Sequence, residues 1–195
     1  MADKKCPNLQ KSIKWCEGEA VYPGIRRRLY FISKSQIAKF AELARDEQGK
    51  ATTAELTGNI ELLADVKWLA LDVNPEKCTV TSEAQGERPS QTQLNKATFV
   101  HNGVGSEASA AASYLNNNDN VFVFQSMSGE WRVLGNPRWT TKTTVAQDTG
   151  QGTNPASTTI SVEVTDEVPA PFYKGTLATE DGSIDCSTGK VTPGK

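Results

Sequence analysis

Hydrophobic and polar residues alternate along much of the chain, which is the pattern of β-strands with one buried and one solvated face. Between Leu56 and Leu63, for example, Ile60 and Leu62 alternate with polar residues. By the same reasoning, further strands are predicted over residues 25–32, 66–73, 77–83, 92–101, 130–134, 138–146, 157–165 and 172–173. Residues 121–124 have the sequence Val-Phe-Val-Phe, which is apolar on both faces and predicts a buried, central strand.

Two segments show a helical period instead. Within residues 35–46, four apolar side chains are spaced as one face of a helix, and Ser33 with Gln36 could form a capping box. From Ser106, a good N-cap residue, a narrow apolar stripe would let a second helix lie close against a sheet. The first set is Ile37, Phe40, Ala41 and Ala44, and the second is Ala108, Ala111, Ala112 and Leu115.

These elements predict a mainly β fold, a β-sandwich or closed antiparallel sheet with one packed α-helix, a second short helix and extended arms. Residues 1–22 are polar and irregular and are expected to form an N-terminal arm. The sandwich domain is predicted over residues 23–175, with a long hairpin arm over 138–165. Residues 176–195 are expected to form a polar tail, mobile from Ala178 onward.

The charge of the chain argues against a sequence-specific DNA reader. It has 21 basic and 23 acidic residues and a formal net charge of -2, so no basic surplus is available to neutralise phosphates. Arg26, Arg27 and Arg28 are the one dense basic cluster, and they lie within a predicted strand. Solvated or ion-paired arginines on a sheet explain this cluster better than a phosphate site does.

Neither a targeting segment nor a cysteine framework is indicated. The first residues lack the apolar core of an ordinary secretory signal, and no apolar stretch approaches membrane-spanning length. The four cysteines are scattered without a C-x-x-C pair, so we expect reduced thiols without a metal, in a protein made in the cytosol. They are Cys6, Cys16, Cys78 and Cys186.

Candidate catalytic residues are few. His101 is the single histidine, and without a second histidine or a nearby cysteine it builds no common transition-metal site. No G-x-S-x-G motif is present, and Gly103-Val104-Gly105 lacks the third glycine of a dinucleotide motif, since Ala108 occupies that position. The acidic residues are dispersed along the strands, which does not indicate the paired carboxylates of a glycosidase. We therefore expect no enzyme, no cofactor and no metal.

The hairpin over residues 138–165 is the candidate functional feature. Its tip is nearly uncharged and offers almost no apolar area, so nothing within one subunit would offset the cost of ordering its backbone, about 1–2 kcal/mol per residue. We expect the tip to be mobile in a monomer and ordered against a neighbouring subunit. Inward positions are predicted at Trp139, Val145, Ile160, Val162 and Val164. The candidate interface residues are Gln147, Asp148, Thr149, Gly150, Gln151, Gly152, Thr153, Asn154 and Pro155.

Several short segments of the chain, and the order in which they occur, resemble one protein family. They are residues 22–25 (YPGI) leading into a strand, 79–87 (TVTSEAQGE), 95–101 (NKATFVH), a short helix, the strand at 121–124, 133–137 (VLGNP) and the long hairpin. From about Tyr22 to Tyr173, the chain is similar to the major tail (tail tube) proteins of long-tailed bacteriophages and prophages. The segment after Ala178 departs from that pattern.

The resemblance implies a virion structural protein of the tail, made in the cytoplasm of a bacterial host. It implies a homo-oligomeric ring, commonly six-membered, that stacks into a tube and contacts other tail proteins. DNA would pass through the lumen as non-specific cargo, so a neutral to acidic lumen is expected, which the net charge allows. No membrane partner is expected.

Other interpretations stay open. Another virion part, such as a head decoration or tail terminator protein, would share the β-rich composition, and only the assembly state would separate them. A carbohydrate-binding β-sandwich could use Trp131 and Trp139 on one face, although the lack of a secretion signal counts against it. An enzyme is the third alternative.

Overall fold

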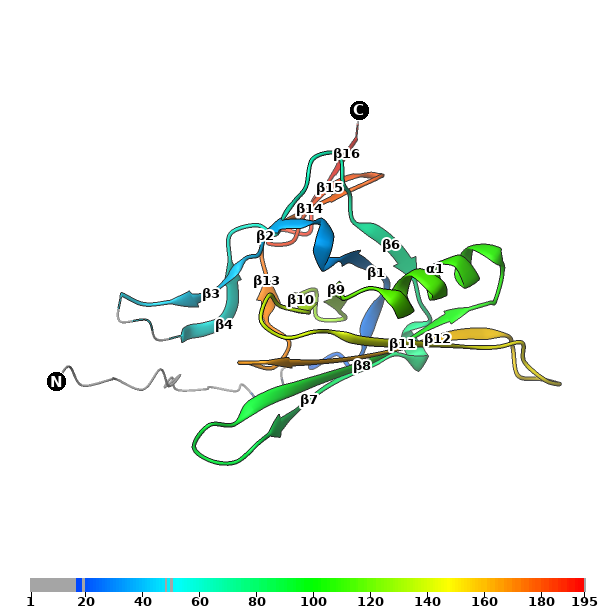
Figure 1. The fold of residues 1–195 in the computed structure, drawn as a ribbon, viewed down its shortest axis with the longest axis horizontal. Coiled ribbons are helices and arrows are strands. Elements are labelled where there is room, and N and C mark those ends of the chain that lie inside the picture. The colour runs from blue at the N-terminus through cyan, green and yellow to red at the C-terminus, as the bar shows by residue number, and fades with distance from the viewer. Residues whose placement is uncertain (1–16, 19, 48, 50, 195) are drawn as a thin grey trace.

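The computed structural model describes residues 17–18, 20–47, 49 and 51–194, and they form a β-sandwich with one α-helix (Figure 1). The predicted fold class is therefore confirmed. Most of the predicted N-terminal arm lies outside the described residues, and Val21 and Tyr22 at its end are exposed.

The strands belong to four sheets. The seven-stranded sheet has the order β3 (Glu42–Arg45), β4 (Ala51–Thr57), β13 (Phe172–Tyr173), β10 (Trp131–Leu134), β9 (Asn120–Ser126), β1 (Ile25–Ser33) and β6 (Leu69–Asp72). The four-stranded sheet has the order β11 (Lys142–Asp148), β12 (Ser157–Asp166), β8 (Thr92–Asn102) and β7 (Thr79–Gln85). The smaller sheets are β14 (Thr176–Thr179), β15 (Gly182–Asp185) and β16 (Val191–Pro193), and the pair β2 (Ile37–Lys39) and β5 (Glu61–Leu62). The helix α1 spans Ser106–Asn117, and two 3₁₀ turns span Lys34–Gln36 and Pro75–Lys77.

The first hydrophobic core lies between the two large sheets. Phe31, Phe122 and Phe124 come from the seven-stranded sheet, and Phe99 and Ile160 come from the four-stranded one. The rings of Phe99 and Phe122 lie 5.9 Å apart between centroids. Fully burying a side chain of this size contributes roughly 1.5–3 kcal/mol, so this layer holds the two sheets together.

The second core covers the other face of the seven-stranded sheet. Val121 and Val123 point to this side, where they share a cluster with Trp68, Leu177 and Ile184. Because β9 packs against a core on each face, its residues Val121, Phe122, Val123 and Phe124 are at most 2% exposed. The predicted central strand is confirmed.

The helix predicted over residues 35–46 is wrong. The chain there forms a 3₁₀ turn, the short strand β2 and the strand β3. Leu43 pairs with Leu56 of β4, and Ile37 pairs with Leu62 of β5, so the apolar residues pack through strand pairing. Ser33 bonds the hydroxyl of Ser35 (2.9 Å), and its side chain does not cap the turn. Pairing with distant strands outweighs the local helical spacing.

The boundaries of two other predicted strands also differ. The predicted strand over residues 56–63 is split between β4 and β5, because Gly58 has a positive φ of 80° that interrupts the extended backbone. The strand predicted to begin at Arg138 begins at Lys142 instead. Asn136 turns the chain there, since its Oδ1 accepts hydrogen bonds from the backbone N–H groups of Arg138 and Trp139, each at 3.0 Å.

Residues 176–195, predicted to form a polar and mobile tail, contain secondary structure. Residues from Thr176 onward form the three-stranded sheet β14–β15–β16. Leu177 is fully buried, and Ile184 and Cys186 are each 6% exposed, because they cover the second core. These side chains, together with a hydrogen bond from Trp68 N–H to Ala178 O at 2.8 Å, attach this sheet to the domain.

Candidate functional site

The β11–β12 hairpin is anchored at its base and free at its tip. β12 pairs with β11 from Glu163 to Ser157, and on its other side it pairs with β8 over its whole length. Ile160, Val162 and Val164 are each 1% exposed and point into the first core, as predicted. Beyond this base the hairpin projects from the body of the molecule (Figure 1).

Helix α1 protects the outer edge of β11. Asn116 Oδ1 accepts a hydrogen bond from the backbone N–H of Val145, and Asp119 Oδ1 accepts one from Thr141, each at 2.8 Å. Ser109 donates to the amide oxygen of Gln147 at 3.1 Å. Side chains that occupy the backbone donors of an edge strand prevent another chain from pairing there.

The tip, residues 149–155, is held only by its own turn. Its residues are exposed except Gly150, which is half-buried. Among the described residues, its hydrogen bonds stay within the hairpin: Gly150 N–H donates to Asp148 Oδ1 at 2.9 Å, and Asn154 N–H donates to Gln151 O at 3.1 Å. A Cβ on Gly150 would lie 2.3 Å from Asn154 O, so this turn requires glycine.

The structure divides the predicted interface residues into two groups. Gln147 and Asp148 belong to β11, and Gln147 Nε2 donates to Thr158 Oγ1 at 3.1 Å, so this glutamine supports the hairpin base. Residues 149–155 form the projecting tip. Val145 packs against the first core, as predicted, whereas Trp139, also predicted to point inward, lies in the loop before β11 and lines a groove.

That groove, here called the β3 groove, lies between β3 and the loop over residues 135–139. Its volume is about 450 Å³. Phe40, Leu43 and Trp139 contribute apolar walls. Two arginines and a glutamate, Arg45, Arg138 and Glu167, form an ion-paired triad beside them.

One carboxylate pairs with two guanidinium groups in the triad, so it keeps a net positive charge. Arg45 Nη2 contacts one carboxylate oxygen of Glu167 at 2.6 Å, and Arg138 Nη1 contacts the other. Next to it, burial raises the pKa of Asp166, although Asn136 Nδ2 (3.1 Å) and the N–H of Glu167 (2.7 Å) donate to it. Sequence reasoning missed the groove because its walls come from segments that lie far apart in the chain.

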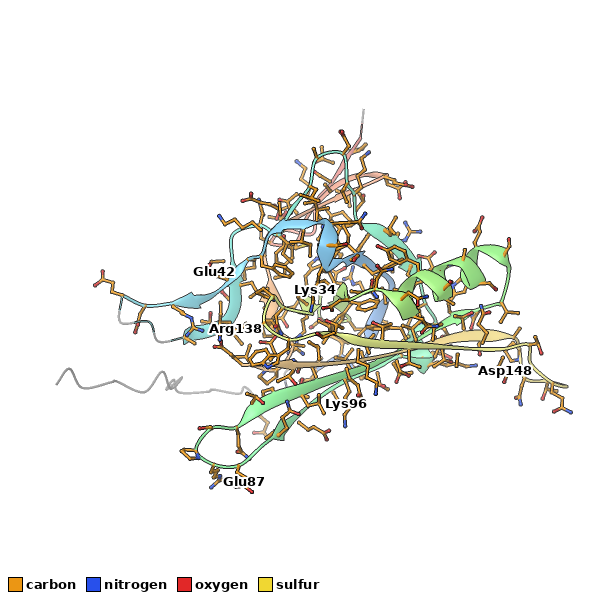
Figure 2. The ribbon with its side chains drawn as sticks, viewed as in Figure 1. Lys34, Glu42, Glu87, Lys96, Arg138 and Asp148 are labelled. Atoms are coloured by element: carbon orange, nitrogen blue, oxygen red, sulfur yellow. The ribbon has the colours of Figure 1, made fainter. Side chains whose placement is uncertain are left out.

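A row of alternating charges crosses the outer face of the four-stranded sheet. Lys142 lies opposite Glu163, and Glu163 lies opposite Lys96. Lys96, which is labelled in Figure 2, also forms an ion pair with Glu83, whose hydrogen bond raises the pKa of the lysine. The row depends on strand register, which the sequence does not reveal, and the flanking positions are mostly threonine and serine.

The strand β7 is an open sheet edge. Its seven residues pair with β8 on one side, and no described residue makes a hydrogen bond to its backbone on the other side. Most of its side chains are exposed. β7 and β11 are therefore the two opposite edges of one sheet, and of these β11 is the protected one.

The residues considered for catalysis and metal binding do not come together. His101 Nδ1 lies 2.7 Å from the carbonyl oxygen of Asp72. Within the described part of the chain, no group of three histidine, cysteine, aspartate or glutamate side chains could hold a metal. Cys78 and Cys186 are buried and free, and burial raises the pKa of the Cys186 thiol to about 12. Cys6 and Cys16 lie outside the described residues.

Trp131 and Trp139 do not share an exposed face that could bind a sugar ring. Trp131 is 6% exposed and packs against Tyr30 with 6.0 Å between ring centroids, so it has no free face for a sugar ring. The arginine cluster is partly ion-paired, since Arg28 contacts Asp72 at 2.7 Å and Arg27 contacts it at 3.8 Å.

Among the described residues, no helix combines the length and the apolar character needed to cross a membrane. Comparison of the chain with models of protein families, with curated proteins and with solved structures found no match.

Proposed function

We propose that this chain is a structural subunit of a bacteriophage tail, and that it assembles into rings that stack into the tail tube through which DNA passes. The proposal rests above all on one observation. The β11–β12 hairpin extends beyond the core, and among the described residues the hydrogen bonds of its tip stay within the hairpin. Such a feature gains stabilisation when it packs against another copy of the chain.

The arrangement of the four-stranded sheet supports a head-to-tail contact. The open edge of β7 lies on the side of the sheet opposite to β11, so each copy offers two different surfaces to its neighbours. When different surfaces meet, the contact repeats from copy to copy and closes a ring if the rotation allows it.

The outer face of the same sheet has the charge that a DNA conduit requires. Lys142, Glu163, Lys96 and Glu83 alternate in sign, and their neighbours are uncharged hydroxyl residues. A face without basic surplus does not retain phosphates, so DNA could slide past it. We propose no catalytic activity and no cofactor for this subunit.

Electron microscopy of the purified protein over a range of concentrations tests the function. Rings and stacked tubes are the expected result, with light scattering giving the number of copies per ring. A protein that stays monomeric at millimolar concentration would contradict the proposal. Single rings that never stack would favour a tail terminator protein, and no self-association would favour a head decoration protein that binds a preformed shell.

A further inference from the structure

A head-to-tail ring needs a surface that receives the hairpin tip. This inference rests on the proposed function, because it identifies the partner surface of the tip within the ring. The receiving surface has to differ from the tip and lie elsewhere on the subunit, since a tip that met the same region of its neighbour would close a dimer.

The open pocket around His101 does not meet this requirement. It is lined by Asn102 and Met127 among others. Asn102 pairs with Ser157, the first residue of β12, so this pocket lies beside the base of the subunit's own hairpin. A tip bound there would place the same end of two copies together, which gives a symmetric pair.

The β3 groove lies at the opposite end of the molecule. Figure 2 places Glu42 and Arg138, which line the groove, toward one end of the long axis, and Asp148, at the base of the tip, near the other end. A tip that enters the groove of the next copy therefore joins opposite ends. A volume of about 450 Å³ falls within the range of about 300–1,000 Å³ seen for binding pockets, which leaves room for part of a turn.

The chemistry of the groove also fits the tip. Residues 147–156 carry one charge, Asp148, and otherwise hydroxyl, amide, glycine, proline and alanine groups. The groove has three basic side chains, Lys39, Arg45 and Arg138, and three acidic ones, which are Glu42, Asp166 and Glu167. Glu167 pairs with both arginines, so acidic and basic groups of the groove partly balance each other, and a nearly uncharged guest adds no charge that would need a partner there, whereas a charged segment would.

We infer that the β11–β12 tip of one subunit seats in the β3 groove of the next. Pro155 and the glycine backbone of the tip contact the apolar walls formed by Phe40, Leu43 and Trp139. Hydroxyl and amide groups of the tip accept hydrogen bonds from the guanidinium groups of the triad. One such contact buries less than the roughly 1,000 Å² that a stable interface requires, so it acts together with other ring contacts.

Disulfide cross-linking tests this arrangement. Cys6 and Cys16 are first replaced by serine, because the remaining Cys78 and Cys186 are buried. Thr153→Cys in the tip is then combined with Glu42→Cys at the groove, both of which are exposed positions without a side-chain hydrogen bond. The matched control combines Thr153→Cys with Glu180→Cys, an exposed glutamate in the β14–β15 turn.

Mild oxidation of the tip and groove variant should give a ladder of covalent multimers that ends at the ring size, while the control and each single variant give at most dimers. Thermal unfolding of every variant checks that the fold is retained. A tip and groove variant that forms dimers alone, or no adducts, overturns the inference.

Electron microscopy of the parent protein distinguishes a failure of the groove contact from a failure of the proposed tail tube function. Rings without a ladder would leave the ring in place and refute the groove as its receiver. A ladder from a parent that forms no rings would support the contact and refute the tail tube.

Discussion

Asn116 at the end of α1 accepts a hydrogen bond from the backbone N–H of Val145 at 2.8 Å, and this contact covers the outer edge of β11. Together with Asp119, which accepts from Thr141, it leaves β7 as the unprotected edge of the four-stranded sheet. The helix thus does more than fill the sandwich. It determines which edge of the sheet another chain can pair with.

Replacing Asn116 with alanine should lower the free energy of unfolding by about 0.5–1.5 kcal/mol, because the Val145 donor loses its partner. It should also increase non-specific association, since β11 becomes available for pairing. Denaturant unfolding and light scattering measure the two effects. Asn117→Ala is the matched control, because Asn117 is exposed and bonds only Ser113 O within the helix. Equal effects of the two substitutions would contradict the protective role.

The C-terminal sheet should behave as part of the domain. Ile184→Ala removes a side chain that is 6% exposed in the second core, so we expect a loss of about 2–5 kcal/mol. Val191→Ala, at a position 56% exposed in the same sheet, should change stability little. Protease treatment of the native protein, followed by mass spectrometry, should leave residues after Thr176 intact. Rapid cleavage there would show that the sheet is detached.

Some elements of the fold could be predicted from the sequence and others could not. Alternation identified β8 and β12 well, because many of their buried residues recur at every second position and point into a core, and the run that is apolar on both faces identified β9. It failed for residues 35–46, where the same apolar residues fit a helix period, and only the distant partners Leu56 and Leu62 decide between the two. In the C-terminal segment, the strands are short and have at most two buried residues each, which left too weak a pattern.

The candidate site was predicted in part for a similar reason. The tip was recognisable because a nearly uncharged, apolar-poor stretch interrupts two alternating strands. The β3 groove and the charge row across β11, β12 and β8 depend on which residues the fold brings together. Glu167, for example, lies 122 positions from Arg45 in the chain, although the two side chains are in contact.

The carboxylate of Asp185, in the C-terminal sheet, should make the free energy of unfolding depend on pH. Hydrogen bonds from the side chains of Ser187 and Thr188 and from the Ser187 N–H lower the pKa of Asp185 to about 2. An aspartate in the unfolded chain has a pKa of about 3.9. Because the folded pKa is the lower one, the stabilisation is present above about pH 4 and is lost as the pH falls toward 2.

Asp185→Asn should therefore lower the melting temperature at pH 7, and the difference from the parent should disappear near pH 2. Thermal unfolding across this range measures it. Glu180→Gln, at an exposed position in the adjacent turn, is the control and should follow the parent throughout. A constant offset at every pH would mean that the turn loses packing in the variant and that the charge is not the cause.

Substitutions at two glycines of the tip distinguish the effect of its backbone shape from the effect of its amino-acid composition. Gly150 and Gly152 both have positive φ, 79° and 62°, so alanine at either position costs about 1–2 kcal/mol of local strain. Only at Gly150 would the added Cβ meet backbone, 2.3 Å from Asn154 O, whereas Gly152 has open space around it. Gly150→Ala should therefore impair ring formation in electron micrographs, and Gly152→Ala should not. Normal rings from both variants would mean that the shape of this turn is irrelevant to assembly.

Removing the tip altogether is the most direct test of its role. Asp148 pairs with Ser157, so replacing residues 149–156 with Asn-Gly closes the hairpin with a two-residue turn of the type that suits such strands. The replacement removes one bond to the rest of the subunit, from Gly103 N–H to Ala156 O at 2.9 Å, which should cost about 1 kcal/mol. The melting temperature of the monomer should therefore fall only slightly, while rings and tubes should be absent from electron micrographs. If the shortened protein still assembles, the tip is not an interface. If it unfolds at a much lower temperature, the tip is an ordinary part of the fold.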